Sequence, residues 1–560
     1  MRRKCWTIAL AVTAAALTTA ARASEKITLD GFWTRYVDGV DPLEFGVPRS
    51  FEPIGGVARY VRKFTLEDEI PESVALLYFD GVVGQATVYL NDVRLGEHGS
   101  FTPFWFEVSD ILLPVGVENE LTVVLDDKLD PTTIPYEEIP WVNYSGIIRD
   151  VYLKFAHRAA IRGAHLQYAF GPQYGWVDGE VAVELIGKPG ESVALAGGIL
   201  EGIPGDWTFF APFTDDAPVT LGPSGRERTT LHFSLGAPKL WSPEEPYLYY
   251  LWVVATVGGL PVDETVDPIG FRDIAVQRQD ILLNGRPIFL KGVCRHDIYE
   301  LTGYDGSQKE MEHDMIRIKQ IGANYVRLIH YPHHPKILEL ADQLGLMVSC
   351  EIPAWANVFD EAVRRKLYTM YEELILRDMN HPSVILWISG NARARPMPYA
   401  AEAQRLAKSL DRNRLASYVI DNDEYDPDAV GADVSFVQEA NLDVYLKITF
   451  WLYYLEFLQD AWANFPKDVH IVIAELGFEG DDREPVIVTP EGDQFFVKET
   501  QQASVMSEQL EGWRPHLPYY AEEHITGMAV YNWQDIDWPD ISRHLPNHIP
   551  NLHFGLVYKD

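Results

Sequence analysis

Two patterns of apolar residues divide the chain near residue 273. Before that point, short runs alternate apolar and polar residues between Gly, Asn and Pro, which is typical of the strands of β-sandwiches. One example is the hairpin expected from Ala86–Leu90 and Val93–Gly96. After that point, apolar strand-like runs alternate with amphipathic helices, such as the one expected over Met311–Ile321. Such alternation is typical of a parallel α/β barrel.

These patterns predict three domains. A chain of 560 residues exceeds what one ordinary domain holds. We expect a β-sandwich over residues 24–155, a second β-sandwich over 156–272 and a (β/α)8 barrel over 273–560.

The first 23 residues predict a secretory signal peptide. Basic residues at positions 2–4 precede an apolar run over 7–19 and a small-residue cleavage site at Ala21-Arg-Ala23. The apolar run is too short to span a bilayer, and no later run is long enough. The sequence therefore predicts a secreted or periplasmic protein without membrane insertion.

Eight barrel strands can be assigned. They are Ile288–Val293, Asn324–Ile329, Leu346–Cys350, Val384–Ile388, Ala416–Ile420, Val434–Val437, Ile471–Ala474 and Gly527–Tyr531. Between the sixth and seventh, Tyr445–Trp462 predicts a very aromatic helix used for packing. Polar residues follow several of these strands directly. Because the carboxyl ends of barrel strands meet at one face, where such folds carry their chemistry, we expect the functional site there.

The composition narrows the range of possible binding partners and cofactors. The formal net charge of −35 disfavours nucleic acid and anionic membrane surfaces. No HExxH, GxSxG, phosphate-binding loop or zinc-type Cys/His spacing occurs, so we expect neither a metal nor a cofactor. Cys294 and Cys350 are expected to be buried free thiols. The sequence leaves the oligomeric state open, a homo-oligomer included.

Glu475 is the first candidate for chemistry. It follows the apolar strand Ile471–Ala474 directly, and a carboxylate in that place is costly unless it serves a polar site. A structural carboxylate paired with an arginine is the alternative.

Three motifs surround the expected barrel face. They are Trp387-Ile-Ser-Gly390-Asn391, Val326-Arg327-Leu-Ile-His330-Tyr-Pro332 and Ala474-Glu475-Leu-Gly477. With them the chain resembles glycoside hydrolase family 2, the β-galactosidase and β-glucuronidase group. Gly146-Ile-Ile-Arg-Asp150 and Leu240-Trp-Ser-Pro243 resemble motifs of the two preceding domains of that family. The resemblance implies an N-terminal jelly-roll sandwich, an immunoglobulin-like sandwich and a TIM barrel.

The resemblance also implies roles for individual residues. Glu475 would be the nucleophile of a retaining glycosidase, which needs two carboxyls about 5–5.5 Å apart. Arg327 would orient Glu475, and His296 and His330 would contact sugar hydroxyls. The remaining residues implied to bind the substrate are Asn391, Glu351, Trp355, Asp535 and Trp533, the last as the floor under the sugar. For Trp105, Trp141 and Tyr144, packing in a core or domain interface is favoured over sugar stacking.

The chain departs from the family pattern at the acid/base position. Ala392 stands where the family has a Glu, and by the strand assignment above Ala440 stands where it has a Tyr. Loss of a general acid costs about 10²–10⁴-fold in rate, most for poor leaving groups. Glu439 is the first candidate for a substitute acid, and Asp421, Asp423 and Glu424, which follow strand five next to strand four, are the alternatives.

Two functions remain in view. The first is a glycosidase that hydrolyses O-glycosyl bonds of a β-linked glycan or oligosaccharide with retention, its acid displaced or missing. The second is an inactive carbohydrate-binding protein on the same scaffold.

Overall fold

The computed structural model describes residues 24–449 apart from short gaps at 69–72, 138, 140, 142, 204–205, 216, 278–279, 300–301, 393–394 and 421–426. Beyond residue 449 it describes the segments 471–476, 480–481, 487–488, 494–495, 525–530 and 552–553. The predicted signal peptide lies outside the described residues. In the part of the chain that is described, the helices are too short or too polar to cross a membrane.

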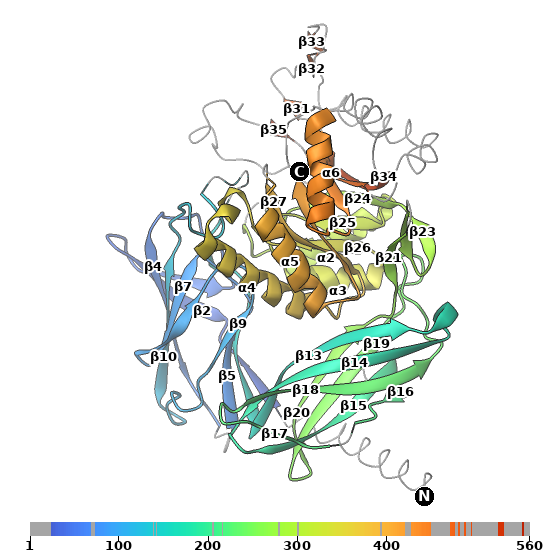
Figure 1. The fold of residues 1–560 in the computed structure, drawn as a ribbon. Coiled ribbons are helices and arrows are strands. Elements are labelled where there is room, and N and C mark those ends of the chain that lie inside the picture. Colours follow the sequence, from blue (N-terminus) through green and yellow to red (C-terminus); the bar gives the residue numbers. More distant parts are fainter. Residues whose placement is uncertain are drawn as a thin grey trace, which may run out of the picture.

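The first domain is a sandwich of two antiparallel sheets, with strand orders β1-β12-β5-β9 and β3-β2-β4-β10-β7-β8 (Figure 1). Alternate residues such as Val88, Leu90 and Val123 fill the space between the sheets, as the period of a strand requires. The strands are β1 Ser24–Thr28, β2 Gly31–Val37, β3 Leu43–Val47, β4 Val57–Thr65, β5 Ser73–Phe79, β6 Val82–Val83, β7 Gln85–Leu90, β8 Val93–His98, β9 Phe104–Glu107, β10 Glu118–Asp126, β11 Gly146–Ile147 and β12 Val151–His157.

The second domain is also a sandwich. A sheet of order β13-β14-β18 packs on one of order β16-β15-β19-β20, in which β17 also pairs with β15. Its core contains Val183, Leu231 and Val253. The strands are β13 Ala159–Phe170, β14 Trp176–Gly187, β15 Ser192–Ile203, β16 Asp206–Pro212, β17 Val219–Thr220, β18 Arg226–Gly236, β19 Tyr249–Val257 and β20 Leu260–Ile269, with a 3₁₀ turn η2 at Pro172–Tyr174.

The third domain is a closed barrel of eight parallel strands, β24-β25-β26-β27-β28-β29-β30-β34, with helices outside it (Figure 1). The barrel strands are β24 Leu290–Arg295, β25 Tyr325–Leu328, β26 Met347–Glu351, β27 Val384–Ala392, β28 Leu415–Ile420, β29 Tyr445–Thr449, β30 Ile471–Leu476 and β34 Ile525–Val530. The helices are α2 Gln308–Gln320, α3 Pro335–Leu344, η3 Ala356–Phe359, α4 Glu361–Asp378, α5 Met397–Leu410 and α6 Pro427–Glu439. The small sheets contain β21 Ile274–Gln277, β22 Asp280–Leu283, β23 Arg286–Ile288, β31 Gly480–Asp481, β32 Ile487–Val488, β33 Gln494–Phe495 and β35 Leu552–His553.

This architecture confirms the predicted fold class, with one wrong strand. The segment predicted as strand six, Val434–Val437, lies in helix α6, and strand six is instead β29, inside the segment predicted as an aromatic helix. A short apolar run fits either a buried strand or one side of a buried helix, so its pattern alone does not decide between them. Pairing with β28 and β30 decides it here.

Local signals place the helix ends. Ser307 and Glu310 form a reciprocal capping box at the start of α2. Helix α3 ends at Gly345, whose φ of 68° is left-handed. A Cβ on Gly345 would lie 2.5 Å from the backbone oxygen of Pro243, which belongs to the segment between β18 and β19 of the second sandwich. Glycine therefore lets the barrel approach that segment closely.

A histidine–aspartate pair joins two barrel units at the end opposite the expected site. His381 Nδ1 lies 2.6 Å from Asp342 Oδ2, and Asp342 also accepts from the Ser383 backbone at 3.0 Å. Burial alone would lower the pKa of His381, but the charge and hydrogen bond of Asp342 raise it above its ordinary value. The folded protein therefore favours the imidazolium.

We predict that His381→Gln destabilises the protein in a pH-dependent way. Because the folded pKa of His381 is raised, its stabilisation is complete below the unfolded pKa of about 6.5 and is lost as pH rises through the folded pKa. The expected loss is about 1.5–3 kcal/mol at low pH and about 1 kcal/mol at high pH. Denaturant unfolding at both pH values measures it. His232→Gln is the matched control, since His232 makes an exposed pair with Asp215. An equal loss at both pH values would contradict the prediction.

Candidate active site

Three neighbouring strand ends bring a buried ionic cluster together. Arg327 on β25 donates from Nη2 to Glu351 Oε2 at 2.7 Å, and Glu351 is the last residue of β26. Their side chains are 0% and 1% exposed. Burial alone would raise the pKa of Glu351, but the charge of Arg327 and the hydrogen bond with His330 lower it. Glu351 is therefore a carboxylate, and its first role is to hold Arg327 and His330.

His330 follows β25 and lies against the same carboxylate. Its Nδ1 is 3.1 Å from Glu351 Oε1, and because a carboxylate only accepts, that nitrogen carries the proton. Asn391, near the end of β27, places its amide 3.4 Å from the same ring and is 1% exposed. The structure thus brings together Arg327, His330, Glu351 and Asn391, all of which the sequence motifs had singled out.

His296 adds an unused hydrogen-bonding group to this cluster. It follows β24, is 4% exposed, and its Nδ1 lies 3.2 Å from the Tyr331 hydroxyl. That hydroxyl already accepts from the Asp297 backbone, so it donates its own proton to His296 Nδ1. Burial, and then the neighbouring positive groups, lower the pKa of His296 well below its ordinary value. The ring is therefore neutral, and its Nε2 is a donor without a hydrogen-bond partner among the described residues.

A second buried network holds the loops after strands one and two. Arg295 donates to Asp297 at 3.0 Å and to Asp314 of α2 at 3.0 Å. Asp297 in turn accepts from the His334 backbone at 2.7 Å. Arg295, Asp297 and Asp314 are all buried. This network therefore positions the backbone on both sides of His296. Motif reading did not assign a role to Arg295 or Asp297.

The first sandwich contributes one wall of the site. Trp141 stacks on His330 with ring centres 5.0 Å apart and meets the edge of Trp355 at 5.6 Å. Phe101 stacks on Tyr331 at 5.0 Å. Arg149 donates to the Phe101 backbone and to the Pro332 backbone, each at 2.7 Å. Trp141 is 3% exposed, so its predicted role in a domain interface agrees with the structure.

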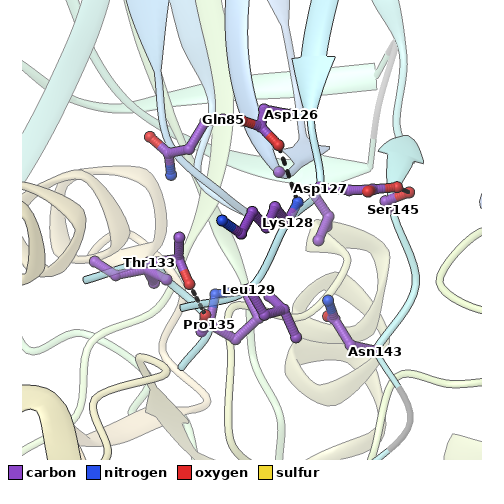
Figure 2. Close-up of a pocket in the computed structure, with 12 residues that line it drawn as sticks. Gln85, Asp126, Asp127, Lys128, Leu129, Thr133, Pro135, Asn143 and Ser145 are labelled. Atoms are coloured by element: carbon purple, nitrogen blue, oxygen red, sulfur yellow. Dashed lines mark hydrogen bonds between the residues drawn. The ribbon is translucent and has the colours of Figure 1, made fainter. Parts of the chain in front are cut away.

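Trp141 is carried by the 127–145 loop, which joins β10 to β11. The two ends of this loop are tied together, because Ser145 donates to Asp127 Oδ2 at 2.8 Å (Figure 2). The same carboxylate accepts from the backbones of Ile54 and Gly56, each at 2.9 Å. Asp127 and Ser145 border a surface pocket of about 240 Å³ of empty space, a volume that includes open solvent. With its carboxylate satisfied, Asp127 serves as an anchor for the loop.

Glu475 lies on β30, next to the cluster along the backbone. It pairs in register with Ile448 of β29. The carbonyl of the preceding residue, Ala474, accepts from Arg327 Nη1 at 3.4 Å and from Cys294 Sγ at 3.1 Å. Strand seven thus reaches Arg327 one residue before Glu475. Cys294 and Cys350 are buried free thiols, as expected.

The prediction that Glu439 substitutes for the missing acid is wrong. It is the last residue of α6, which precedes β29, so it lies at the amino end of the barrel strands and is exposed. Asp443, shortly after it, bonds the backbone of Ala416 at the start of β28, at 2.8 Å. Ala440 lies at the same end and is not the counterpart of the family Tyr. The residues that follow β29 lie outside the described part of the chain.

Of the other residues assigned from the sequence, two are described by the structure and two lie outside the described part of the chain. Trp355 follows β26 and packs against Trp141 and His330, as part of the wall. Ala392 is the last residue of β27, paired with Ile420 of β28. Trp533 and Asp535 lie outside the described residues, so their placement stays a prediction.

Comparison with protein families agrees with this arrangement. Residues 57–183 match the glycosyl hydrolase 2 galactose-binding domain-like model, residues 212–272 a glycosyl hydrolases family 2 model, and residues 274–452 the family 2 TIM barrel model. Together these matches cover more than half of the chain, in the domain order of one family. The chain belongs to glycoside hydrolase family 2.

Family 2 members among curated proteins are similar to part of this chain. A β-galactosidase of Thermoanaerobacter pseudethanolicus is 26% identical over 366 residues, covering 64% of this chain and 48% of that protein. A β-galactosidase of Thermoanaerobacterium thermosulfurigenes is 29% identical over 333 residues, covering 58% and 45%. The aligned region thus spans less than half the length of these relatives.

Solved family 2 structures share the fold over nearly the whole chain. A β-galacturonidase from Eisenbergiella tayi bound to galacturonate superposes with a TM-score of 0.79 at 22% identity, covering 96% of this chain and 94% of that one. A Bifidobacterium dentium β-glucuronidase complexed with coumarin-3-O-glucuronide gives 0.77 at 20% identity, covering 96% and 94%. At these identities the likeness establishes the fold.

We predict that Glu351→Leu destabilises this family 2 barrel by about 3–5 kcal/mol, because it leaves the Arg327 charge buried without a carboxylate. Urea unfolding followed by tryptophan fluorescence measures the loss. Glu439→Leu is the control, since Glu439 is exposed at a helix end and should change stability by about 0.5 kcal/mol or less. A loss below about 1 kcal/mol for Glu351→Leu would show that the ion pair does not support the site.

Proposed function

We propose that this protein is a β-glycosidase that hydrolyses O-glycosyl bonds with retention of configuration, with Glu475 as its nucleophile. The observation that supports this most is the position of Glu475. It lies near the end of β30, and the carbonyl of Ala474 beside it accepts from Arg327, whose guanidinium belongs to the buried cluster of Glu351 and His330. A carboxylate beside a fixed positive charge stays ionised, which a nucleophile requires.

The other residues of the cluster suit the recognition of a sugar. His296 offers an Nε2–H donor in a nearly dry site, and His330 and Asn391 lie beside it. A polar donor that is satisfied only by a ligand hydroxyl gives strong discrimination, since its burial is otherwise costly. Trp355, which is partly buried, adds an apolar face of the kind that packs against sugar rings. Neutral donors and aromatic walls favour a carbohydrate over an anion such as a phosphate ester.

In the proposed reaction, Glu475 attacks the anomeric carbon while the bond to the leaving oxygen breaks. Water then hydrolyses the glycosyl–Glu475 ester from the same face, and the two inversions give retention. The similar proteins include a β-galactosidase, a β-glucuronidase and a β-galacturonidase. Galactosides, glucuronides and galacturonides are therefore the first substrates to test.

A second candidate is a carbohydrate-binding protein without hydrolytic activity. Ala392 favours it, because the end of β27 carries a methyl group in place of a carboxyl. The two candidates differ in one step. Both bind a glycoside, but only the first forms a covalent bond between the sugar and Glu475.

We predict that a dinitrophenyl 2-fluoro-β-glycoside of the right sugar labels Glu475. The dinitrophenolate leaves without protonation, so the missing acid does not prevent the first step, and the fluorine slows the second. Peptide mass spectrometry locates the label. Glu475→Gln is the control and should take none. Turnover with the label on another residue would refute the assignment, whereas binding by calorimetry without label or turnover would favour the second candidate.

We also propose that the protein is secreted or periplasmic. The support is the basic, apolar and small-residue pattern of residues 1–23. N-terminal sequencing of the protein exported by its host should begin at Ser24. A mature protein that retains residues 1–23 would contradict this proposal.

A further inference from the structure

The end of strand four offers no proton donor. Ala392 closes β27, and the carboxylates described near this end of the barrel are bound to positive groups. Glu351 is held by Arg327 and His330, and Asp297 by Arg295 and the loop backbone. Burial would raise the pKa of both carboxyls, but Arg327 and His330 lower the pKa of Glu351, and the charges of His333 and Arg295 lower that of Asp297, below the ordinary value. In the described part of the chain, neither carboxyl can supply a proton near neutral pH.

The turn after strand four carries a positive charge instead. Arg395, three residues beyond Ala392, donates from Nε to Asp433 Oδ1 at 2.6 Å, and its side chain is 30% exposed. Asp433 is itself held by the hydroxyl of Tyr445 at 2.7 Å. A guanidinium does not give up its proton in proteins, so Arg395, which is paired with Asp433, cannot act as a general acid.

We propose that the site selects β-glycosides whose leaving group departs as a stable anion, namely glycosides of phenols and enols and glycosyl esters of carboxylic acids. This inference rests on the proposed function and narrows its substrate class. Alkyl glycosides, including the bonds between two sugars, leave as a strongly basic alkoxide and require protonation. Among the described residues at this face, position 392 carries no carboxyl, and Glu351 and Asp297 are both held as carboxylates.

The chemistry balances without a protein acid. As the glycosidic C–O bond breaks, its electron pair leaves with the aglycone oxygen as a phenolate, enolate or carboxylate, and Glu475 bonds to the anomeric carbon. Water then adds to that carbon, Glu475 leaves as a carboxylate, and the proton released by the water balances the aglycone anion. The products are the free sugar and the protonated or ionised aglycone, according to pH.

The test is a leaving-group series on the intact protein. For glucuronides, galacturonides and galactosides, kcat/KM is measured with dinitrophenyl, nitrophenyl, phenyl and methyl aglycones, with sugar release as the readout. We compare the ratio of kcat/KM for the dinitrophenyl glycoside to kcat/KM for the methyl glycoside. This ratio should be about 10²–10⁴-fold larger in the wild type than in a variant that has an acid. We also expect no fall of kcat/KM on the alkaline side, because no acid has to stay protonated.

Two variants at one position supply the matched comparison. Ala392→Glu introduces a carboxyl and should raise methyl glycoside hydrolysis by about 10²-fold or more, flatten the series and add an alkaline limb to the pH profile. Ala392→Gln introduces a side chain of nearly the same size as Glu but without an acid. This variant should keep the steep dependence of kcat/KM on the leaving group and the flat alkaline side of the pH profile. Glu439→Gln should match the wild type throughout, because Glu439 lies at the other end of the barrel.

The outcomes separate this inference from the function on which it rests. A steep wild-type series that Ala392→Glu alone flattens supports it. Methyl glycoside hydrolysis within about tenfold of the nitrophenyl glycoside would overturn the inference and leave the glycosidase function standing, since an acid would then come from elsewhere in the chain. If no dinitrophenyl glycoside turns over and no label forms on Glu475, the proposed function and the inference both fall.

Discussion

The ion pair between Arg327 and Glu351 is the interaction on which the site depends. It joins the second and third barrel strands, is excluded from water, and at the same time fixes the proton of His330 and holds a guanidinium beside the backbone of strand seven. A buried ion pair of this kind is rarely a net source of stability, because desolvation offsets most of the attraction. Its value lies in orientation, since a carboxylate satisfied by two partners cannot turn elsewhere.

The site is built by two domains, not by the barrel alone. The barrel supplies the strand ends, and the first sandwich supplies Trp141 through a loop whose two ends are tied together by Asp127 and Ser145. Arg149 makes the connection rigid, because its guanidinium bonds a backbone carbonyl on each side of the interface. The first sandwich therefore supplies the wall against which His330 of the barrel packs.

Sequence reasoning singled out four residues that the structure brings together at neighbouring strand ends. Arg327, His330, Glu351 and Asn391 were assigned from motifs, and parallel strands necessarily gather their carboxyl ends at one face. It failed at strand six, where two apolar runs competed and the wrong one was taken as the strand. That error led directly to Glu439, because its place at the site depended entirely on the strand assignment.

The sequence by itself determined the domain order, seven of the eight barrel strands and the absence of a carboxyl at Ala392. These are local properties, because they follow from residue identity and from the period of apolar positions. Only the tertiary structure decided that α6 is a helix, that His296 Nε2 has no hydrogen-bond partner among the described residues, and that Trp141 reaches the barrel. Each of these depends on contacts between residues far apart in the chain, and their free energy has no local signature in the sequence.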